Sequence, residues 1–570
     1  MIVARRVYLY GIAFASVWML VSGVGGLLEI AFKAVLELLA GPLQIFGASL
    51  LADEVSFYGS LTGIGLLVWA IHWALAARAL RQHEVVERRS AIRKLYLYGV
   101  LLVGGVLLLY QLRMLFLDLL GVMFGTVSGA DFASGTLSSP LAMVLTAGVL
   151  WAYHARIAAL DRAIVPETGA GATIRRWCVY LLALIGLMLL VIGTVDLVTR
   201  LIDFALPSDA QVIDPSGDWL ALETSGPLAS MLTGLLVWLP AWLWSTRRFL
   251  QETGPDPERD SVLRKVYLYG VLLIAVSWTV WNLGQMLYVA LRSLLIPSEA
   301  GALWSSVQED FGGAVTNVAI YGLAWAYHGY VIRREAQAAT EVGRQATIRW
   351  IYGYLVALVG GITFGGGVGG TLATVLDLLF QPGTQTSEYW WQEQLSLYAT
   401  LIVVGLPVWL IPWLRLQREA VDGTARRSLA RRIYLFLILG LTVLGLLGTG
   451  AYTLYQVLRV ILGDRWTASN TSDLIQAASA AAVAGLMLAY HLQVFRQDAA
   501  LAQADEEAAP PSPADERVTL LVIRPASPAD AAALRERLDA ALPAGTDVQT
   551  VSLSSKDAAR MLAASRDAPQ

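Results

Sequence analysis

Three histidines recur at equivalent positions in the sequence and are the residues best suited to metal chemistry. His154 and His328 each end a "WAYH" segment, and His491 ends the related segment "LAYH". Imidazole is the commonest metal ligand in proteins, but three histidines on separate segments can share one ion only if those segments surround a common axis. Histidine also suits the wet boundary of a membrane. We favour the boundary position and expect neither a metal site nor a cofactor.

Neutral polar residues within the apolar segments are the next candidates for ligand binding. Asn282 and Gln285 lie in one such segment, and Asn317 lies in the following one. Amide side chains inside a membrane usually form hydrogen bonds between helices, each worth about 0.6 kcal/mol, and a substrate site is the alternative. The centres of the apolar segments carry no ionisable residue of the kind that marks ion pathways or proton relays. We therefore expect no catalytic site and no enzymatic activity.

A glycine-rich stretch, "VGGITFGGGVGGTLATVLD" at 359–377, is the densest oddity of the sequence. Small residues spaced by four let two helix backbones approach closely. The alternative is a hinge or an unwound segment that lines a cavity, as in transporters. The glycines with this spacing are Gly361, Gly365 and Gly369, together with Gly366 and Gly370.

The composition indicates the solvent in which these residues work. The chain has 570 residues, of which 56% are hydrophobic and 15% charged, whereas a soluble domain carries about 25% charged residues. Successive segments offer roughly 20 apolar residues, enough to cross a hydrocarbon core about 30 Å thick. The formal net charge of −3 does not favour a nucleic-acid partner. We expect a multi-pass protein of the plasma membrane whose main partner is the lipid bilayer.

A short phrase precedes the first apolar segment of each repeat. It reads "RRVYLYG" at 5–11, "RKLYLYG" at 93–99 and "RKVYLYG" at 264–270. The arginines that lead the six units are Arg6, Arg93, Arg175, Arg264, Arg349 and Arg432. Arginine and tyrosine favour the headgroup layer, so we interpret the clearest examples as interfacial anchors, with the lining of a binding site as the alternative. These anchors are Arg6, Tyr8, Tyr10, Arg93, Tyr96, Tyr98, Arg264, Tyr267 and Tyr269.

The units alternate between two kinds of ending, so the true repeat is a pair of units. Units one, three and five end in "VWAIHW", "VWLPAW" and "VWLIPW", whereas the others end in the histidine segments. Fixed internal periods indicate repeat architectures. We expect an all-α polytopic membrane protein with twelve transmembrane helices, arranged as six hairpins in three tandem pairs. The pairs are predicted at residues 1–170, 171–345 and 346–498.

Charge sets the expected orientation of the hairpins. The connections between units are rich in Lys and Arg, whereas the tips within units are acidic and contain Arg465 as their one basic residue. Basic loops stay on the cytoplasmic side during insertion. We therefore expect cytoplasmic N- and C-termini and external tips.

The C-terminal tail differs from the rest of the chain. Residues 499–516 are acidic and proline-rich, as in a flexible linker. The pattern beyond it predicts a small cytoplasmic βαβα unit at 517–570, with strands at 517–525 and 547–553. Because two strands make a marginal sheet, we expect residues 517–564 to associate with a second copy or with a cytoplasmic protein.

The repeated "(R)RxYLY" phrase and the paired apolar segments resemble a bacterial integral-membrane family, the domain of unknown function 5671. The resemblance covers roughly residues 1–497 in three tandem copies, and the third unit departs from it with Trp177 and Cys178 in place of the tyrosine pattern. It implies a membrane location, and supplies no activity and no site residues.

Three classes of function stay open. A membrane scaffold or sensor with a cytoplasmic interaction unit is favoured by the uncharged segment centres and by the tail. A transporter or channel for an uncharged or lipid-like substrate is the alternative, favoured by the internal repeats and the glycine-rich segment. A membrane-embedded enzyme ranks last, because no acid–base constellation supports it.

Overall fold

The computed structural model describes most of the chain as helices. The described residues are 2–40, 48–127, 137–205, 219–250, 258–297, 300–338, 343–381, 388–463, 465–508 and 537. These residues contain no strand. The predicted linker 499–516 is described only as far as residue 508, where it continues a helix, and the predicted βαβα unit lies outside the described residues except for Arg537. Two units are distinguished, Met1–Asp498 and Ala499–Gln570, and the first of them contains the helical bundle.

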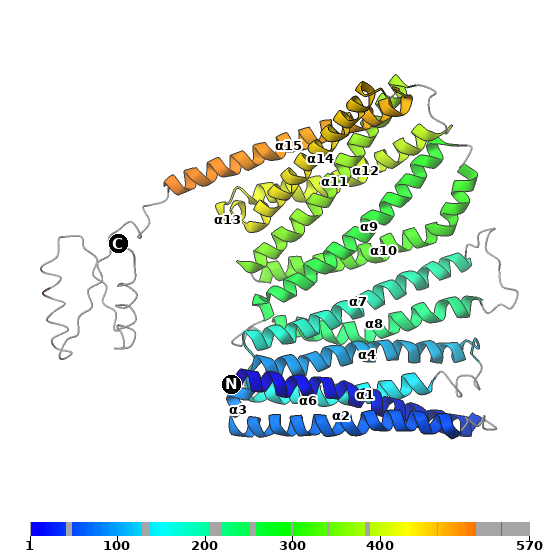
Figure 1. Ribbon diagram of the computed structural model, residues 1–570, viewed down its shortest axis with the longest axis vertical. Coiled ribbons are helices and arrows are strands. Elements are labelled where there is room, and N and C mark those ends of the chain that lie inside the picture. The colour runs from blue at the N-terminus through cyan, green and yellow to red at the C-terminus, as the bar shows by residue number, and fades with distance from the viewer. Residues whose placement is uncertain are drawn as a thin grey trace. The chain divides into compact units, whose positions relative to one another are not determined.

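Long helices pair as successive hairpins (Figure 1). The first pair of hairpins is α1 (Ile2–Ala40) with α2 (Ala48–Gln82), and α4 (Ala91–Met123) with α6 (Ser138–Ile164). The second pair is α7 (Ala170–Ala205) with α8 (Trp219–Leu250), and α9 (Val262–Leu295) with α10 (Ala300–Ala338). The third pair is α11 (Arg344–Phe380) with α12 (Trp390–Glu419), and α14 (Leu429–Ile461) with α15 (Ala468–Ala508).

A short helix occupies the connection between the two hairpins of each pair. These are α3 (Glu84–Arg88), η2 (Glu258–Asp260) and α13 (Gly423–Arg426). Ser261 and Ser428 then begin the next long helix, because each side-chain oxygen accepts a hydrogen bond from the backbone N–H three residues later. The basic connections are thus partly helical, which the sequence pattern did not predict.

Eleven helices of the described chain are long and apolar enough to cross a membrane, which indicates a multi-pass membrane protein. The exception among the long helices is α10, in which no described stretch is both long and apolar enough. The prediction of an all-helical membrane bundle is therefore confirmed for the described residues, whereas the count of twelve spans is not.

The first helices of the hairpins form a continuous line through the bundle. Contacts run from α1 to α4, then to α7, α9, α11 and α14. The second helices flank this line, and the hairpins follow one another in chain order (Figure 1). The three pairs therefore lie in a row within this unit.

Glycines bring the two helices of each odd-numbered hairpin into backbone contact. A Cβ atom added to Gly23 of α1 would lie 2.5 Å from the backbone nitrogen of Thr62 on α2. The equivalent glycines Gly193 and Gly367 face α8 and α12 in the same way, with 2.6 Å to Met231 N and 2.8 Å to Ile402 N. No side chain fits at these distances, so the close packing depends on glycine.

Candidate functional site

One end of the bundle holds a set of mostly buried polar and aromatic side chains that recurs three times, with one exposed tyrosine in each copy. We call each set a polar clamp. The first clamp consists of Tyr10, Trp69, Trp73, Arg93, Tyr96, Tyr153, His154 and Asp161. The second consists of Tyr180, Trp238, Trp242, Arg264, Tyr267, Tyr327, His328 and Glu335. The third consists of Tyr354, Trp409, Trp413, Arg431, Tyr434, Tyr490, His491 and Asp498.

Each clamp draws on all four helices of its pair. In the first pair, α1 supplies Tyr10, α2 supplies Trp69 and Trp73, and α4 supplies Arg93 and Tyr96. Residues spaced by three or four lie on one face of a helix, so the two tryptophans face the same neighbour, as do the arginine and its tyrosine. The fourth helix, α6, adds a tyrosine, a histidine and a carboxylate.

A buried ion pair forms the centre of each clamp. The arginine guanidinium uses Nε and Nη2 to reach the carboxylate. In the first and third clamps these two groups donate to different oxygens in a fork geometry, which is the strong form of this interaction, whereas in the second clamp both donate to Oε1 of Glu335. The arginine side chains are at most 3% exposed. The pairs and their two donor–acceptor distances are Arg93–Asp161 (2.7 and 3.3 Å), Arg264–Glu335 (2.8 and 2.6 Å) and Arg431–Asp498 (2.6 and 3.0 Å).

Each guanidinium also lies over an indole ring. The distances from the arginine Cζ to the ring centroid are 5.6 Å for Trp73, 5.3 Å for Trp242 and 5.9 Å for Trp413. Such cation–π contacts are worth about 0.5 to 2 kcal/mol, with the higher value for desolvated pairs. The charge of the arginine is thus compensated from two sides, which makes its burial tolerable.

A chain of hydrogen bonds fixes the histidine of the first clamp. The Nε1–H group of Trp69 donates to Tyr96 Oη (3.1 Å), which lies 3.1 Å from His154 Nε2. His154 Nδ1 lies 2.9 Å from the backbone oxygen of Leu150. The carbonyl can only accept, so the network assigns the proton to Nδ1 and leaves Nε2 to accept from the tyrosine. A ring nitrogen engaged in this way is not open to a metal ion.

The second clamp differs from the others at its histidine. Nδ1 of His328 bonds to the oxygen of Ala324 at 2.8 Å, but its buried Nε2 has no hydrogen-bond partner within the described chain. In the third clamp Tyr434 Oη lies 3.2 Å from His491 Nε2, as in the first.

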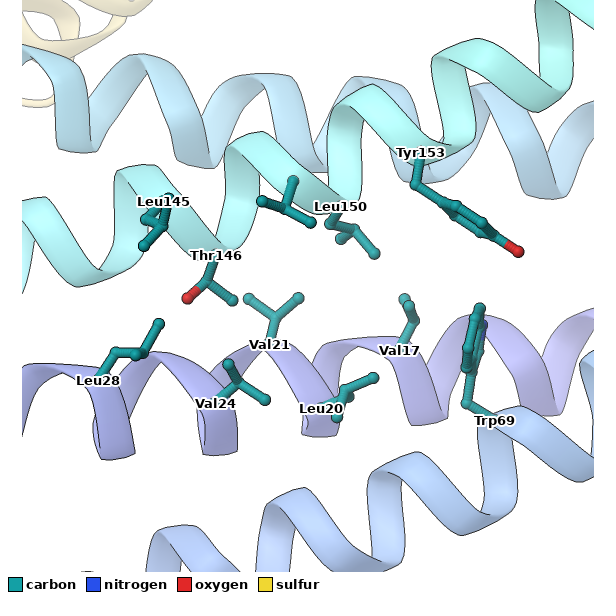
Figure 2. A pocket seen from close by; sticks show the side chains of 11 residues that line it. Val17, Leu20, Val21, Val24, Leu28, Trp69, Leu145, Thr146, Leu150 and Tyr153 are labelled. Atoms are coloured by element: carbon teal, nitrogen blue, oxygen red, sulfur yellow. The ribbon is translucent and has the colours of Figure 1, made fainter.

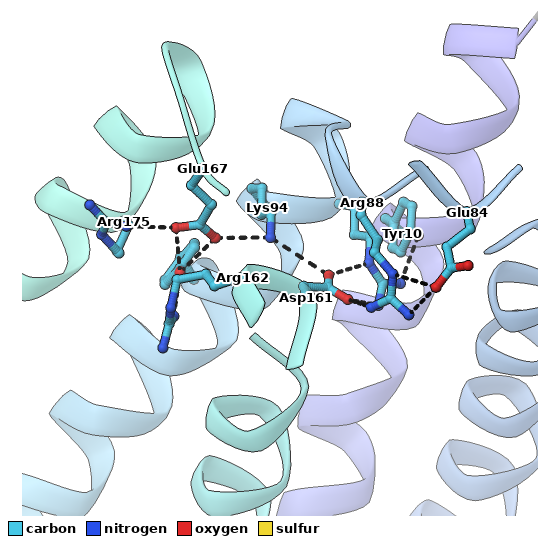
Figure 3. A network of polar contacts seen from close by, with 10 residues as sticks. Tyr10, Glu84, Arg88, Lys94, Asp161, Arg162, Glu167 and Arg175 are labelled. Atoms are coloured by element: carbon cyan, nitrogen blue, oxygen red, sulfur yellow. Dashed lines mark hydrogen bonds and ion pairs between the residues drawn. The ribbon is translucent and has the colours of Figure 1, made fainter. Parts of the chain in front are cut away.

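Further ion pairs link the first clamp to the second pair of hairpins (Figure 3). Lys94 Nζ lies 2.8 Å from Glu167 and 3.6 Å from Asp161. Glu167 lies in the connection to α7, where it also pairs with Arg175 at 3.0 Å and accepts a bond from Tyr98 at 2.9 Å. The two buried carboxylates thus join α4, α6 and α7 at one end of the bundle.

The comparison with protein families explains the threefold recurrence. The family model described as "Domain of unknown function (DUF5671)" matches residues 6–149, 176–318 and 354–487, which is more than half of the chain. The chain belongs to this family. Each DUF5671 match begins in the first helix of one hairpin and ends in the second helix of the next, so one copy corresponds to two hairpins. Comparisons with curated proteins and with solved structures give no match.

The structure places most of the predicted anchors against other helices of the DUF5671 copies. Tyr8 alone among them is exposed, at 60%, and Arg6 is half-buried and pairs with Glu87 at 2.9 Å. The other seven are buried, namely Tyr10, Arg93, Tyr96, Tyr98, Arg264, Tyr267 and Tyr269. These seven side chains connect helices, and the exposed Tyr8 has its ring centroid 5.5 Å from that of His72 on α2.

Three of the predicted leading arginines are out of register by one residue. Trp350, not Arg349, occupies the position of Arg6 in the fifth unit, because it precedes Tyr354 by four residues as Arg6 precedes Tyr10. Arg176, not Arg175, occupies the position of Arg6, because it pairs with Glu258 at 3.0 Å as Arg6 pairs with Glu87. Likewise Arg431, not Arg432, is the clamp arginine of the last unit.

The three amide candidates are not brought together. Asn282 and Asn317 donate to backbone oxygens four residues earlier on their own helices, Trp278 and Gly313, each at 2.8 Å. Gln285 is exposed. Within the described residues these amides form no bond between helices that would support the predicted packing role.

The predicted glycines face two different helices. Gly361 faces Trp409 of α12 and Met487 of α15, Gly365 and Gly369 face Val483 of α15, Gly370 faces Tyr398 of α12, and space is open at Gly366. The closest backbone contacts of α11 involve Gly360 and Gly367, which the spacing did not single out. α11 is helical from Arg344 to Phe380, so the glycines do not unwind it.

The alternative of a metal site required the three histidines to converge, and each of them instead lies in its own clamp. Within the described part of the chain, no three His, Cys, Asp or Glu side chains are arranged to hold a metal ion. The clamp groups already bind one another, so the arrangement is suited to holding helices together. The carboxylates were missed by sequence reasoning, although each follows the repeated histidine by seven residues, as Asp161 follows His154.

Proposed function

We propose that this DUF5671 protein is a non-enzymatic scaffold or sensor of the plasma membrane. The observation that carries the proposal is the polar clamp, which ties four helices together in each pair and occurs three times. A bundle whose helices are fixed to one another at one end suits a scaffold better than a transporter, which alternates between two open states.

We further propose that all twelve long helices span the bilayer, with both termini in the cytoplasm and the clamps at the cytoplasmic ends of the helices. α10 carries Tyr327, His328 and Glu335 at the same places where α6 and α15 carry their clamp residues, and this equivalence supports a twelfth span. The basic connections support the orientation.

The C-terminal residues 517–564 are the proposed interaction unit, for a second copy or for a cytoplasmic protein. These two partners are distinguished by the oligomeric state of the purified full chain, compared with that of a chain that ends after residue 516. A lower oligomeric state after truncation supports self-association, and an unchanged state leaves a cytoplasmic protein as the partner.

A transporter or channel for an uncharged or lipid-like substrate is the second candidate. It is favoured by an apolar cavity between α1 and α6. Purified protein reconstituted in vesicles tests both proposals. The scaffold predicts no flux of small neutral solutes and no exchange of fluorescent phospholipids between leaflets above protein-free vesicles. Flux that disappears when Gly234→Leu forces α7 and α8 apart would instead support the transporter.

A further inference from the structure

A cavity of about 440 Å³ lies between α1 and α6 (Figure 2). Its walls are the facing aliphatic side chains of the two helices, and Trp69 of α2 and Tyr153 of α6 form the end nearest the clamp. The aliphatic residues are Val17, Leu20, Val21, Val24, Leu28, Leu145, Val149 and Leu150, and Thr146 completes the lining.

The polar groups of the lining are already used within the protein. Thr146 Oγ1 donates to the backbone oxygen of Ala142 at 2.8 Å. Tyr153 Oη accepts from Trp73 Nε1 at 2.8 Å, and Trp69 Nε1 donates to Tyr96. A polar ligand would lose its hydration here without equivalent partners, so the cavity selects an apolar one.

The dimensions of the cavity match one leaflet of a membrane. From Val17 to Leu28 the α1 helix rises about 16 Å, close to half of a hydrocarbon core about 30 Å thick. The indole and phenol rings stand at the end where a headgroup layer begins. Arg156 is exposed one turn beyond Tyr153 on α6, and it forms no ion pair within the described residues. Guanidinium binds phosphate in a bidentate manner.

The other two pairs carry different side chains at the same position. Gly361 and Gly365 replace Val17 and Val21 in the third pair, and there Met487 and Val483 of α15 pack within 3.6 Å of where a Cβ would be. In the second pair the larger Leu187 takes the place of Val17, and Ile320 and Ala324 of α10 pack against its core cluster. Within the described residues the side chains at this position thus differ in size between the three pairs.

We propose that this cavity binds one acyl chain of a phospholipid from the leaflet on the clamp side, with the headgroup phosphate on Arg156. The proposal goes beyond the scaffold role and rests only on the membrane placement. The occupant follows from the apolar lining, from the length that matches one leaflet, and from the exposed guanidinium of Arg156 at the correct end of the cavity.

Photolabelling of the full chain in vesicles tests the proposal. The probe is a phospholipid with a diazirine in the middle of one acyl chain, and the cross-linked residues are located by peptide mapping. We expect labelling concentrated at 20–28 and 145–150. Val24→Trp, which fills the cavity, should lower this labelling about tenfold, equivalent to 1.4 kcal/mol. The matched control Leu67→Trp, on an exposed face of α2, should leave it unchanged.

The contact between the headgroup phosphate and Arg156 has a separate test that does not use the cavity-filling variant. A diacylglycerol probe with the same diazirine lacks the phosphate. The wild-type chain should prefer the phospholipid probe, and Arg156→Ala should remove this preference. Labelling spread evenly over exposed faces, or cavity labelling that survives Val24→Trp, would overturn the proposal while leaving the membrane placement intact. Absence of labelling anywhere would contradict the placement itself.

Discussion

Arg93 and Asp161 lie 68 residues apart in the sequence, yet they form a buried fork-shaped ion pair at 2.7 Å between α4 and α6. Removing one partner of such a pair leaves an uncompensated charge and costs about 3 to 5 kcal/mol. Asp161→Asn should therefore lower the thermal stability of the purified protein strongly. The exposed pair Arg200–Glu223 provides the control, because Arg200→Ala should cost less than about 1 kcal/mol. Equal effects of the two substitutions would refute a structural role for the clamp.

The three clamps should differ in stability according to the burial of their carboxylates. The side-chain exposure is 1% for Asp161, 5% for Glu335 and 18% for Asp498. Solvent screens the more exposed pair, so Asp498→Asn should destabilise least. Denaturation of the variants in the same detergent gives the ranking of their stability losses. If Asp498→Asn causes the largest loss, the burial of the carboxylate does not determine the order.

The tyrosine at the centre of the hydrogen-bond chain gives a comparison between clamps. Tyr96→Phe removes the partner of both Trp69 and His154, whereas Tyr267→Phe removes the partner of Trp238 only. A buried group left without its partner costs about 1 to 3 kcal/mol. Tyr96→Phe should lower the free energy of unfolding more than Tyr267→Phe. Equal losses would show that the bond to His154 contributes nothing.

Glycine contacts should control the packing of the odd-numbered hairpins. A Cβ at Gly234 would overlap the backbone of Leu190 on α7, whereas a Cβ at Gly366 meets open space. Gly234→Ala should destabilise the protein by about 1 to 3 kcal/mol through overpacking. Gly366→Ala should be neutral or mildly stabilising, since alanine favours helices more than glycine does. Thermal melts of both variants check the contrast.

Much of the fold could be predicted from the sequence, because hydrophobic length and the repeated phrase follow directly from the physics of the bilayer. The predicted alignment of the repeat units was wrong where two arginines are adjacent, as at Arg175 and Arg176, because the sequence does not show which of them begins the unit. The burial of Tyr96 and Arg93 could not be predicted, because a phrase at a helix end looks the same whether it faces lipid or a neighbouring helix. Their partner Asp161 lies in a basic connection, where charge counting treated it as part of a solvated loop.

The central claim is a membrane bundle whose clamps all lie on the cytoplasmic side, and cysteine accessibility tests it most directly. Cys178 is the only cysteine and is buried, so Cys178→Ala gives a cysteine-free background. Val421→Cys marks the clamp end and Leu462→Cys marks a hairpin tip, and both positions are more than 80% exposed. In intact cells a membrane-impermeant maleimide should label Leu462→Cys at once and Val421→Cys only after permeabilisation. Labelling of Val421→Cys from outside, or of both positions equally, would contradict the account.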